Sequence, residues 1–357
     1  MSEKRPLVSI LVLNYNGKEF LKACFDSLLA GIYKNIEIVL VDNNSSDDSV
    51  DFTRENFKQV RILQTGSNSG YSRAYNLALR ESNGKYAVLL NNDVEVAGNW
   101  LESLVSIAES DQNIAALQPK IRSLIDEGYF EYAGASGGHM DIFGYPFLRG
   151  RLFFTTEMDE GQYDDEAEVF WTSGAAMFVR IDSLRKSGYL DEDFVHHMEE
   201  IDLCWRLQLV GYKLKVVPES VIYHYAGATI KPDSFMKLYW NHRNGIFMML
   251  KNFELKSLFR VLLLRFLLDF VNIFFAAFVR LNFSHAYAII KAYVWLIFHP
   301  AMIMRKRDEV QKMRTLPDKY IWPMLYRKSV VKEYFIKGNK TFKSLKFTPN
   351  FKRNAAS

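Results

Sequence analysis

The stretch Leu89-Leu90-Asn91-Asn92-Asp93-Val94-Glu95-Val96 joins an apolar run to a group of amides and carboxylates. The run begins at Tyr86 and is short, branched and apolar, which is the pattern of a strand buried on both faces. An acidic group after such a strand lies at the carboxyl edge of an open sheet, where α/β folds bind ligands. Asp93 is therefore placed to hold a divalent cation, and that cation would in turn bind phosphates. The alternative is a polar turn that caps the next helix.

The segments before this stretch alternate between short apolar runs and amphipathic runs. Strands are expected at Val8–Leu13, Ile36–Val41 and Val60–Gln64, and helices at Lys18–Leu29, from Ser49 and at Ser72–Arg80. This alternation of strands and helices predicts an α/β fold whose mostly parallel sheet is flanked by crossover helices. The first strand is followed by a single glycine, Gly17, so the sequence excludes a dinucleotide-binding oxidoreductase fingerprint.

Composition narrows the class of protein. The 357 residues are 49% hydrophobic and 15% aromatic, which excludes a disordered chain. A net charge of +4 is small for this length and gives no ground for nucleic-acid binding. Cys24 and Cys204 stand among apolar residues and are interpreted as small buried hydrophobes, which fits a reducing compartment.

Three carboxylates begin a predicted helix at Glu199-Glu200-Ile201-Asp202. Helical spacing puts Asp202 on one face with Arg206, where the two can pair, and puts Glu200 at the head of an otherwise apolar face. A lone carboxylate there is the one whose pKa burial raises, as a general base near neutrality requires. Glu200 is therefore the candidate base. The alternative is a structural set of first-turn acids favoured by the helix dipole.

Several motifs together resemble the family 2 glycosyltransferases of the GT-A fold. Their order and spacing match over about the first 230 residues, and the closest branch is the bacterial rhamnosyltransferase-like enzymes. The motifs are Val-Leu-Asn-Tyr-Asn-Gly at 12–17, Val-Asp-Asn-Asn-Ser-Ser-Asp-Asp-Ser at 41–49, Asn68-Ser69-Gly70-Tyr71 with Arg73 and Asn76, and Leu-Asn-Asn-Asp-Val at 90–94.

The resemblance implies roles in binding a nucleotide sugar. Asp42 would accept from the imide N–H of uracil or thymine, because a carboxylate offers only acceptors, and Tyr15 would pack beside that base. A plain helix cap is the alternative for Asp42. Arg73 belongs to a matching motif and is assigned to the same donor site. Asn91 and Asn92 stand where the family often carries aspartate, and Asp93 matches its metal-binding aspartate.

The resemblance also implies a metal ligand and a base. His224 precedes a small-residue turn, as does the family histidine that reaches the metal, and imidazole with carboxylate suits Mn²⁺, with Mg²⁺ as the alternative. The other interpretation is a structural histidine whose ring nitrogens find hydrogen-bond partners in the core. Family members usually have Glu-Asp where this chain has Glu199-Glu200, and the second residue acts as base. The sequence leaves open which of the two glutamates does so here.

The segment Val169–Val179 contains the small residues Gly174, Ala175 and Ala176, which allow a ligand to approach the backbone closely. In the resembling family it lines the cleft under sugar and acceptor. Trp171 would either stack on a sugar or pack in the core. Residues 121–165 are predicted to form loops and short strands, in which His139 is structural.

The C-terminal third has a different character. We expect a GT-A domain at 1–230, an apolar and amphipathic helical region at 231–310 and a basic tail at 311–357. Residues 258–279 are apolar but include Arg265, Asp269 and Asn272 on one side, as expected for a helix that lies in the membrane interface or packs on another helix. The cations after Pro300 favour an anionic cytoplasmic leaflet, namely Arg305, Lys306, Arg307, Lys312 and Arg314. An ordinary helical subdomain or a homodimer interface is the alternative.

The leading hypothesis is an inverting glycosyltransferase that moves a sugar from a UDP- or dTDP-linked donor to a saccharide or lipid-linked saccharide acceptor in cell-surface polysaccharide synthesis. We expect it in the cytoplasm, peripherally attached to the inner face of a bacterial inner membrane. The alternative from another class is a non-catalytic membrane-associated scaffold that kept the fold. A nucleotidyltransferase is a third interpretation.

Overall fold

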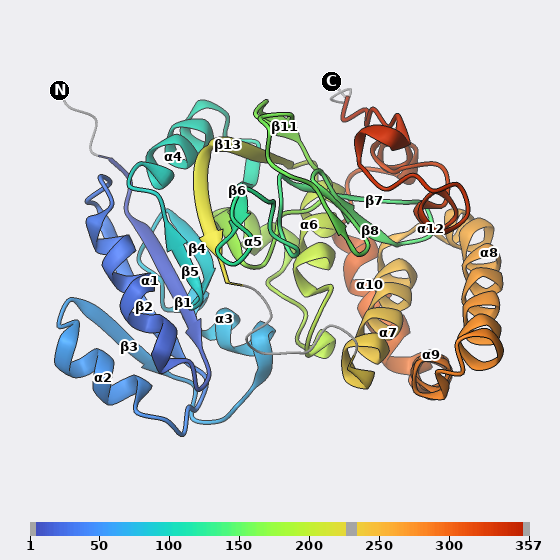
Figure 1. The fold of residues 1–357 in the computed structure, drawn as a ribbon, viewed down its shortest axis with the longest axis horizontal. Helices are drawn as coiled ribbons and strands as arrows, with labels where there is room; N and C mark the ends of the chain where they lie inside the picture. Colours follow the sequence, from blue (N-terminus) through green and yellow to red (C-terminus); the bar gives the residue numbers. More distant parts are fainter. Residues whose placement is uncertain (1–4, 226–233, 353–357) are drawn as a thin grey trace.

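A computed structural model describes residues 5–225 and 234–352. In the described part of the chain, a nine-stranded sheet with its helices forms one half of the molecule, and the C-terminal helices form the other (Figure 1). A second sheet of four short strands lies between them.

The first four long strands are parallel. They are β1 (Val8–Asn14), β2 (Ile36–Asp42), β3 (Val60–Gln64) and β4 (Tyr86–Asn91), connected by α1 (Lys18–Ala30), α2 (Ser49–Asn56) and α3 (Gly70–Arg80). These bounds confirm the elements expected from the apolar periodicity. The register pairs Asn14 with Asp42 and Leu13 with Asn91, so the polar residues after β1, β2 and β4 gather at one edge of the sheet.

The rest of the sheet is mixed. β12 (Ala176–Arg180) is antiparallel to both β4 and β6 (Ile114–Ser123), and β13 (Lys213–His224) is parallel to β6. The short strands β5 (Val94–Val96) and β11 (Ala167–Glu168) add to β13 in antiparallel fashion. The strand and helix repeat did not predict this change of direction. It places His224 opposite Val94, and hence beside Asp93.

Helices cover both faces of the nine-stranded sheet. One hydrophobic cluster joins the sheet to α1 and α4 (Trp100–Ser110). The other joins it to α3, α5 (Ile181–Ser187) and α6 (Glu199–Leu209). Residues of the C-terminal half belong to this second cluster, so the main core continues across the boundary expected near residue 230. The division into domains stays a prediction.

The central segment forms loops and short strands, as expected: β7 (Gly138–Met140), β8 (Pro146–Leu148), β9 (Arg151–Leu152) and β10 (Thr155–Thr156). His139 is buried against Phe342 and Phe347, which confirms its structural role. Trp171 is buried and donates from Nε1 to the His139 carbonyl at 2.8 Å, so its core interpretation is correct.

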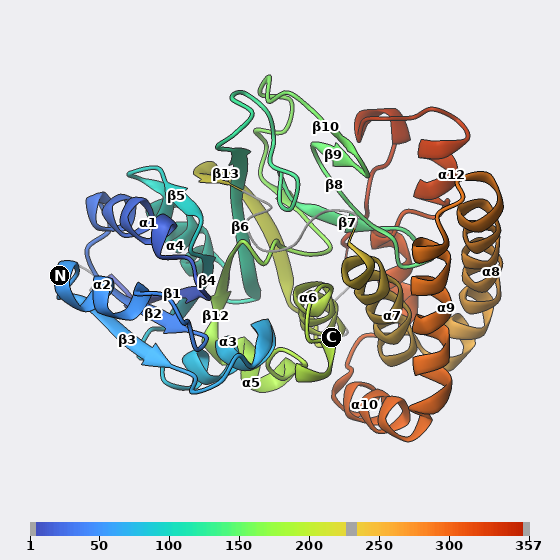
Figure 2. The ribbon, with the colours of Figure 1, turned by 60° about the horizontal axis from the view of Figure 1, so that its bottom comes forward.

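Four helices follow the sheet: α7 (Phe235–Asn252), α8 (Leu255–Phe274), α9 (Phe283–Phe298) and α10 (Pro300–Met313). A π-helical turn at Phe275–Val279 extends α8. Figure 2 shows α7 between α6 and α9, with α8 on the outside. The remaining short elements, α11 (Asp318–Ile321), α12 (Val330–Phe335) and the 3₁₀ turns Glu192–Phe194, Trp322–Met324 and Lys343–Leu345, complete the described chain.

The polar stripe of α8 faces the protein, as expected. Arg265 and Asp269 are buried and pair at 2.9 Å, and Tyr145 donates to Asp269 at 2.8 Å. Among the described residues, the helix Leu255–Val279 alone is long and apolar enough to cross a membrane, and 22% of its most apolar stretch is buried. The pair α9 and α10 meets the same criterion only when joined across a 78° bend.

The basic segment of α10 differs from the expectation. Lys306 pairs with Asp191 at 2.9 Å, and Arg307 donates to the Leu250 carbonyl at 2.6 Å. Arg314 pairs with Asp318 at 2.7 Å. Three of the five cations assigned to an anionic membrane are therefore engaged with the protein itself, because buried carboxylates and helix carbonyls attract them inward. Arg305 and Lys312 remain exposed.

Candidate active site

Asp93 and His224 meet at the carboxyl edge of the sheet. His224 Nε2 lies 3.0 Å from Asp93 Oδ1, and His224 Nδ1 lies 3.3 Å from Glu131 Oε2. All three side chains are buried. Burial opposes the imidazolium, but the Glu131 and Asp93 carboxylates prevail and raise the pKa of His224 to about 10. A helix-cap role for Asp93 is wrong, because α4 begins only at Trp100, after Asn99.

This pair has the chemistry of a divalent-cation site. A carboxylate oxygen and an imidazole nitrogen converge, and a second carboxylate on the other ring nitrogen is the usual outer support of a metal-bound histidine. Within residues 5–225 and 234–352, no group of three His, Cys, Asp or Glu gathers as a complete cation site. The remaining ligands would be donor phosphates and water, as is common for Mg²⁺-type sites.

The two asparagines before Asp93 bind neighbouring strands. Asn91 approaches His224 Nε2 with its side-chain nitrogen at 3.3 Å, and its backbone N–H donates to the Ala175 carbonyl at 3.0 Å. Asn92 donates to Asn14 Oδ1 at 2.6 Å. Asn91 therefore touches the candidate metal ligand, whereas Asn92 ties the turn to the end of β1.

Asp42 and Tyr15 lie at the ends of β2 and β1. Asp42 is fully buried, and its Oδ2 accepts from the Ser45 N–H at 3.2 Å. Its Oδ1 has no hydrogen-bond partner in the described part of the chain. The helix-cap alternative is wrong, because Asp48 precedes α2. Tyr15 is 45% exposed. The adjacent strands β2 and β1 therefore lead to a buried hydrogen-bond acceptor, Asp42, and to an accessible aromatic ring, Tyr15.

Glu199 and Glu200 open α6 after a strained loop. Desolvation raises the pKa of Glu200 to about 7, with its own N–H and that of Ile201 partly offsetting the shift. Desolvation, and then the neighbouring Glu200, raise the pKa of Glu199 well above its ordinary value. Asp202 and Arg206 pair at 2.8 Å, which confirms the helical phase assigned from the sequence.

Gly174 lies between Glu200 and the polar residues around Asp93. A Cβ built on Gly174 would lie 3.7 Å from the Glu200 Cβ and 2.7 Å from the Tyr71 hydroxyl, which itself donates to the Gly174 carbonyl at 2.9 Å. The next residue, Ala175, accepts from the N–H of Asn91. Glu200 therefore lies close to Gly174, and the residue after Gly174 bonds the backbone of Asn91, two residues before Asp93.

Arg73 lies on α3 and pairs with Glu192 at 3.2 Å, with both side chains largely exposed. Asn76, in the same motif, exchanges two hydrogen bonds with the backbone of Leu190 at 2.9 and 3.1 Å. This motif thus also anchors the segment that leads into α6. The donor-binding role of Arg73 stays a prediction.

Glu131 was not foreseen. It follows β6 in a loop, and its side chain meets His224 only because β6 and β13 pair in the sheet. The residues around it carry no motif, so the signal for this contact lies in the strand pairing rather than in the local sequence.

The sequence matches the family model described as "Glycosyl transferase family 2" over residues 9–176. It is 25% identical to the N-acetylglucosaminyl-diphospho-decaprenol L-rhamnosyltransferase of Mycobacterium tuberculosis over 262 residues, covering 68% of this chain and 83% of that protein. It is 27% identical to the O-antigen biosynthesis protein RfbC of Myxococcus xanthus over 247 residues, covering 66% of this chain and 18% of that protein.

Solved structures share the fold, among them two that contain a nucleotide or nucleotide sugar and Mn²⁺. GalNAc-T7 with UDP, GalNAc and Mn²⁺ has a TM-score of 0.55 at 18% identity, over 70% of this chain and 48% of that one. The mannosyltransferase PcManGT of Pyrobaculum calidifontis, in complex with GDP-Man and Mn²⁺, has a TM-score of 0.50 at 14% identity, over 87% and 85% of the two chains. The match to the glycosyl transferase family 2 model over residues 9–176, the similarity to the named rhamnosyltransferase and the shared GT-A fold together support a glycosyltransferase.

Proposed function

We propose that this glycosyltransferase transfers a sugar, with inversion, from a UDP- or dTDP-linked donor to a saccharide or lipid-linked saccharide in cell-surface polysaccharide synthesis. The names of the rhamnosyltransferase and O-antigen relatives support the type of product and acceptor. The arrangement of Glu200, Asp42 and Asp93 around the carboxyl edge of the sheet supports the reaction type.

The donor nucleotide occupies the ends of β1 and β2. The unpartnered Oδ1 of Asp42 accepts from the imide N–H of the pyrimidine, and the exposed ring of Tyr15 packs against its face. Asn91, Asn92, Arg73 and the backbone at Gly174 complete the donor site.

Asp93 and His224 would hold Mn²⁺ or Mg²⁺, with Glu131 orienting the imidazole. When bound, such a cation supplies charge neutralisation for the departing diphosphate. The carboxylate and imidazole fix where the diphosphate lies, and thereby which face of the anomeric carbon is turned toward the acceptor.

Glu200 acts as the general base. Its carboxylate takes the proton of the acceptor hydroxyl while that oxygen forms a bond to the anomeric carbon. The bond between the anomeric carbon and the diphosphate oxygen breaks on the opposite side, and the diphosphate leaves with the electron pair. Attack opposite the leaving group inverts the anomeric configuration.

The position of Glu200 carries this assignment: it heads α6 beside Gly174, and the next residue, Ala175, bonds the backbone of Asn91 near Asp93. Its pKa, raised to about 7 by desolvation, supports it. A base with a pKa near 7 is about half ionised at neutral pH, and it binds a proton strongly enough to remove one from a hydroxyl in the transition state. Glu199 fits this task less well, because it is almost fully buried and its pKa is raised well above the ordinary value.

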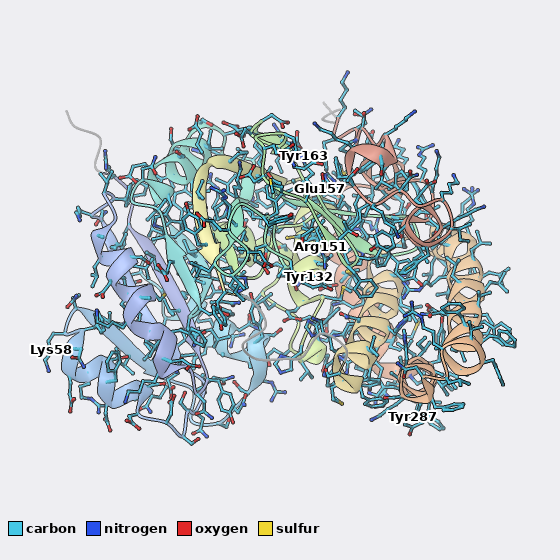
Figure 3. The ribbon with its side chains drawn as sticks, viewed as in Figure 1. Lys58, Tyr132, Arg151, Glu157, Tyr163 and Tyr287 are labelled. Carbon is cyan, nitrogen blue, oxygen red and sulfur yellow. The ribbon has the colours of Figure 1, made fainter. Side chains whose placement is uncertain are left out.

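The outer face of α8 and α9 supports attachment to a membrane surface. Exposed apolar patches of this extent are rare on soluble monomers. Tyr287 lies at the outer edge of the helical half (Figure 3). The large exposed apolar side chains there include Phe259, Leu263, Phe266, Phe270, Phe274, Phe278, Tyr287, Ile290, Val294 and Ile297. With the polar stripe of α8 turned inward, we place the enzyme peripherally on the inner face of a bacterial inner membrane, near lipid-linked acceptors.

The test is a screen of UDP- and dTDP-linked hexoses with Mn²⁺ for a rise in unfolding temperature, followed by measurement of released nucleoside diphosphate. Glu200→Gln should abolish release while keeping the donor-induced rise. Full turnover by that variant would remove Glu200 from the mechanism. Donor binding without hydrolysis or transfer by the wild-type protein would favour the non-catalytic scaffold.

A further inference from the structure

The loop that leads into the candidate base has an unusual backbone. Val195, His197 and Met198 have φ of 60°, 66° and 72°. The His196 N–H donates to the Phe194 carbonyl at 2.6 Å, which closes a positive-φ γ-turn around Val195. Positive φ is rare for a β-branched residue, and such conformations persist only where the surroundings impose them.

Asn244 of α7 binds this loop. Its Nδ2 lies 2.9 Å from the Phe194 carbonyl, 2.7 Å from that of His196 and 2.7 Å from that of His197. The side chain is fully buried. One amide group therefore gathers three loop carbonyls, and for the carbonyls of His196 and His197 it supplies the hydrogen-bond donor.

Arg243 fixes the orientation of this amide. Its Nε donates to Asn244 Oδ1 at 2.6 Å, so the amide nitrogen must face the loop carbonyls. The Arg243 guanidinium also donates to the Phe194 carbonyl at 3.1 Å. Its Cζ lies 4.5 Å from the Trp240 ring centre and 4.4 Å from that of Trp295. Trp295 belongs to α9, so contacts run from the outer helices through Arg243 and Asn244 to the loop.

We propose that Asn244 is a positioning residue for Glu200, held in orientation by Arg243, and that α7 thereby sets where the base meets the acceptor. This inference rests on the proposed function of Glu200. The loop ends at Met198, one residue before α6, so its conformation fixes the first turn of that helix. A shift of about 1 Å in a reacting group can lower turnover a hundredfold.

The same helix offers a matched control. Asn252, also fully buried on α7, donates to the Asp202 side chain at 2.8 Å and makes no hydrogen bond to the 193–198 loop in the described structure. Asn252→Ala removes a buried amide of the same kind and weakens the same packing of α7 on α6. It therefore reports the cost to stability without a direct effect on the loop.

The experiment compares Asn244→Ala with Asn252→Ala and wild type, using the nucleotide sugar that gives the largest Mn²⁺-dependent rise in unfolding temperature. We expect kcat of Asn244→Ala to fall at least about tenfold with the donor KM changed less than about twofold. The acid limb of its pH–rate profile should move to lower pH, because a loosened loop admits water to Glu200. The groups that face Glu200 are Glu199 and Cys204 on α6 and Tyr71 on α3, and all are retained.

Hydrogen exchange gives a readout without turnover. In Asn244→Ala, amides of 195–200 should exchange faster while those of β1 to β4 keep their rates. Asn244→Ser, which keeps one donor, should show exchange rates between those of wild type and Asn244→Ala. It replaces the alanine variant in the comparison if that variant does not fold. A pH–rate profile and loop exchange equal to those of Asn252→Ala would overturn the inference. If Glu200→Gln instead keeps full turnover, the proposed base is wrong, and that result is separate from the behaviour of Asn244.

Discussion

His224 holds Asp93 and Glu131 on its two ring nitrogens, with Nε2 3.0 Å from Asp93 Oδ1. A strand pairing between β13 and β5 brings the imidazole to the turn after β4. A cation held by Asp93 and His224 would take the place of the proton that Nε2 now shares with Asp93 Oδ1.

The first prediction concerns this pair. Asp93→Asn and His224→Ala should each remove most of the Mn²⁺-dependent rise in unfolding temperature seen with UDP, because ligand at about one hundred times Kd stabilises by about 2.7 kcal/mol. Differential scanning fluorimetry with and without EDTA measures it. Glu95→Gln, two residues from Asp93, is the control and should keep the rise. An unchanged rise in both ligand variants would place the cation elsewhere.

The second prediction concerns the pyrimidine. Asp42→Asn should weaken binding of UDP by about tenfold or more, since a hydrogen bond to a charged group contributes about 1.5–3 kcal/mol. Cytidine diphosphate has no imide N–H, so the wild-type preference for UDP over CDP should shrink in the variant. Calorimetric titration of both nucleotides checks this. Asp48→Asn, on the exposed turn before α2, should bind both as wild type does.

The third prediction follows from the pKa of Glu200, raised from 4.5 to about 7 by desolvation. A raised carboxyl pKa means that the fold favours the protonated form, so a stability penalty develops between pH 4.5 and 7 and is complete above pH 7. Glu200→Gln removes this penalty. The variant should be more stable than wild type at pH 8, by up to about 3 kcal/mol, with the two converging near pH 5. Urea unfolding at pH 5 and pH 8 tests the sign of the difference in unfolding free energy between the variant and wild type.

The fourth prediction concerns the buried ion pairs that Lys251 of α7 makes with Asp191 and with Asp202 of α6. Lys251 lies 3.0 Å from Asp202 and also binds Asp191, and all three side chains are buried. Lys251→Met should cost about 3–5 kcal/mol, because it leaves buried carboxylates short of a cation. Lys22→Met, which breaks an exposed pair with Asp26, should cost less than about 1 kcal/mol. Equal losses in the two variants, measured by urea unfolding, would contradict this account.

Local patterns were sufficient to predict β1 to β4 and their helices, because each strand is a short apolar run that ends in polar residues. The same patterns placed Asp42 and Asp93 at one sheet edge. Helical spacing also predicted the Asp202–Arg206 pair, which the structure contains at 2.8 Å.

Contacts between distant segments could not be predicted in this way. The antiparallel insertion of β12 brings Gly174 to Glu200, and the pairing of β13 with β6 brings Glu131 to His224. Asn244 lies on a helix whose sequence shows only amphipathic spacing, and its role depends on loop carbonyls that a sequence pattern does not reveal. The internal contacts of Lys306 and Arg307 could not be predicted for the same reason, because Asp191 and the Leu250 carbonyl lie on distant segments.

The most direct measurement is a crystal structure of Glu200→Gln with Mn²⁺ and an intact nucleotide sugar. The account predicts a cation bound by both Asp93 and His224, and the pyrimidine imide on Asp42. It also predicts that the anomeric carbon faces the amide introduced at position 200 across space for an acceptor hydroxyl. A donor whose anomeric carbon faces away from that position, or a cation that does not touch Asp93, would contradict it.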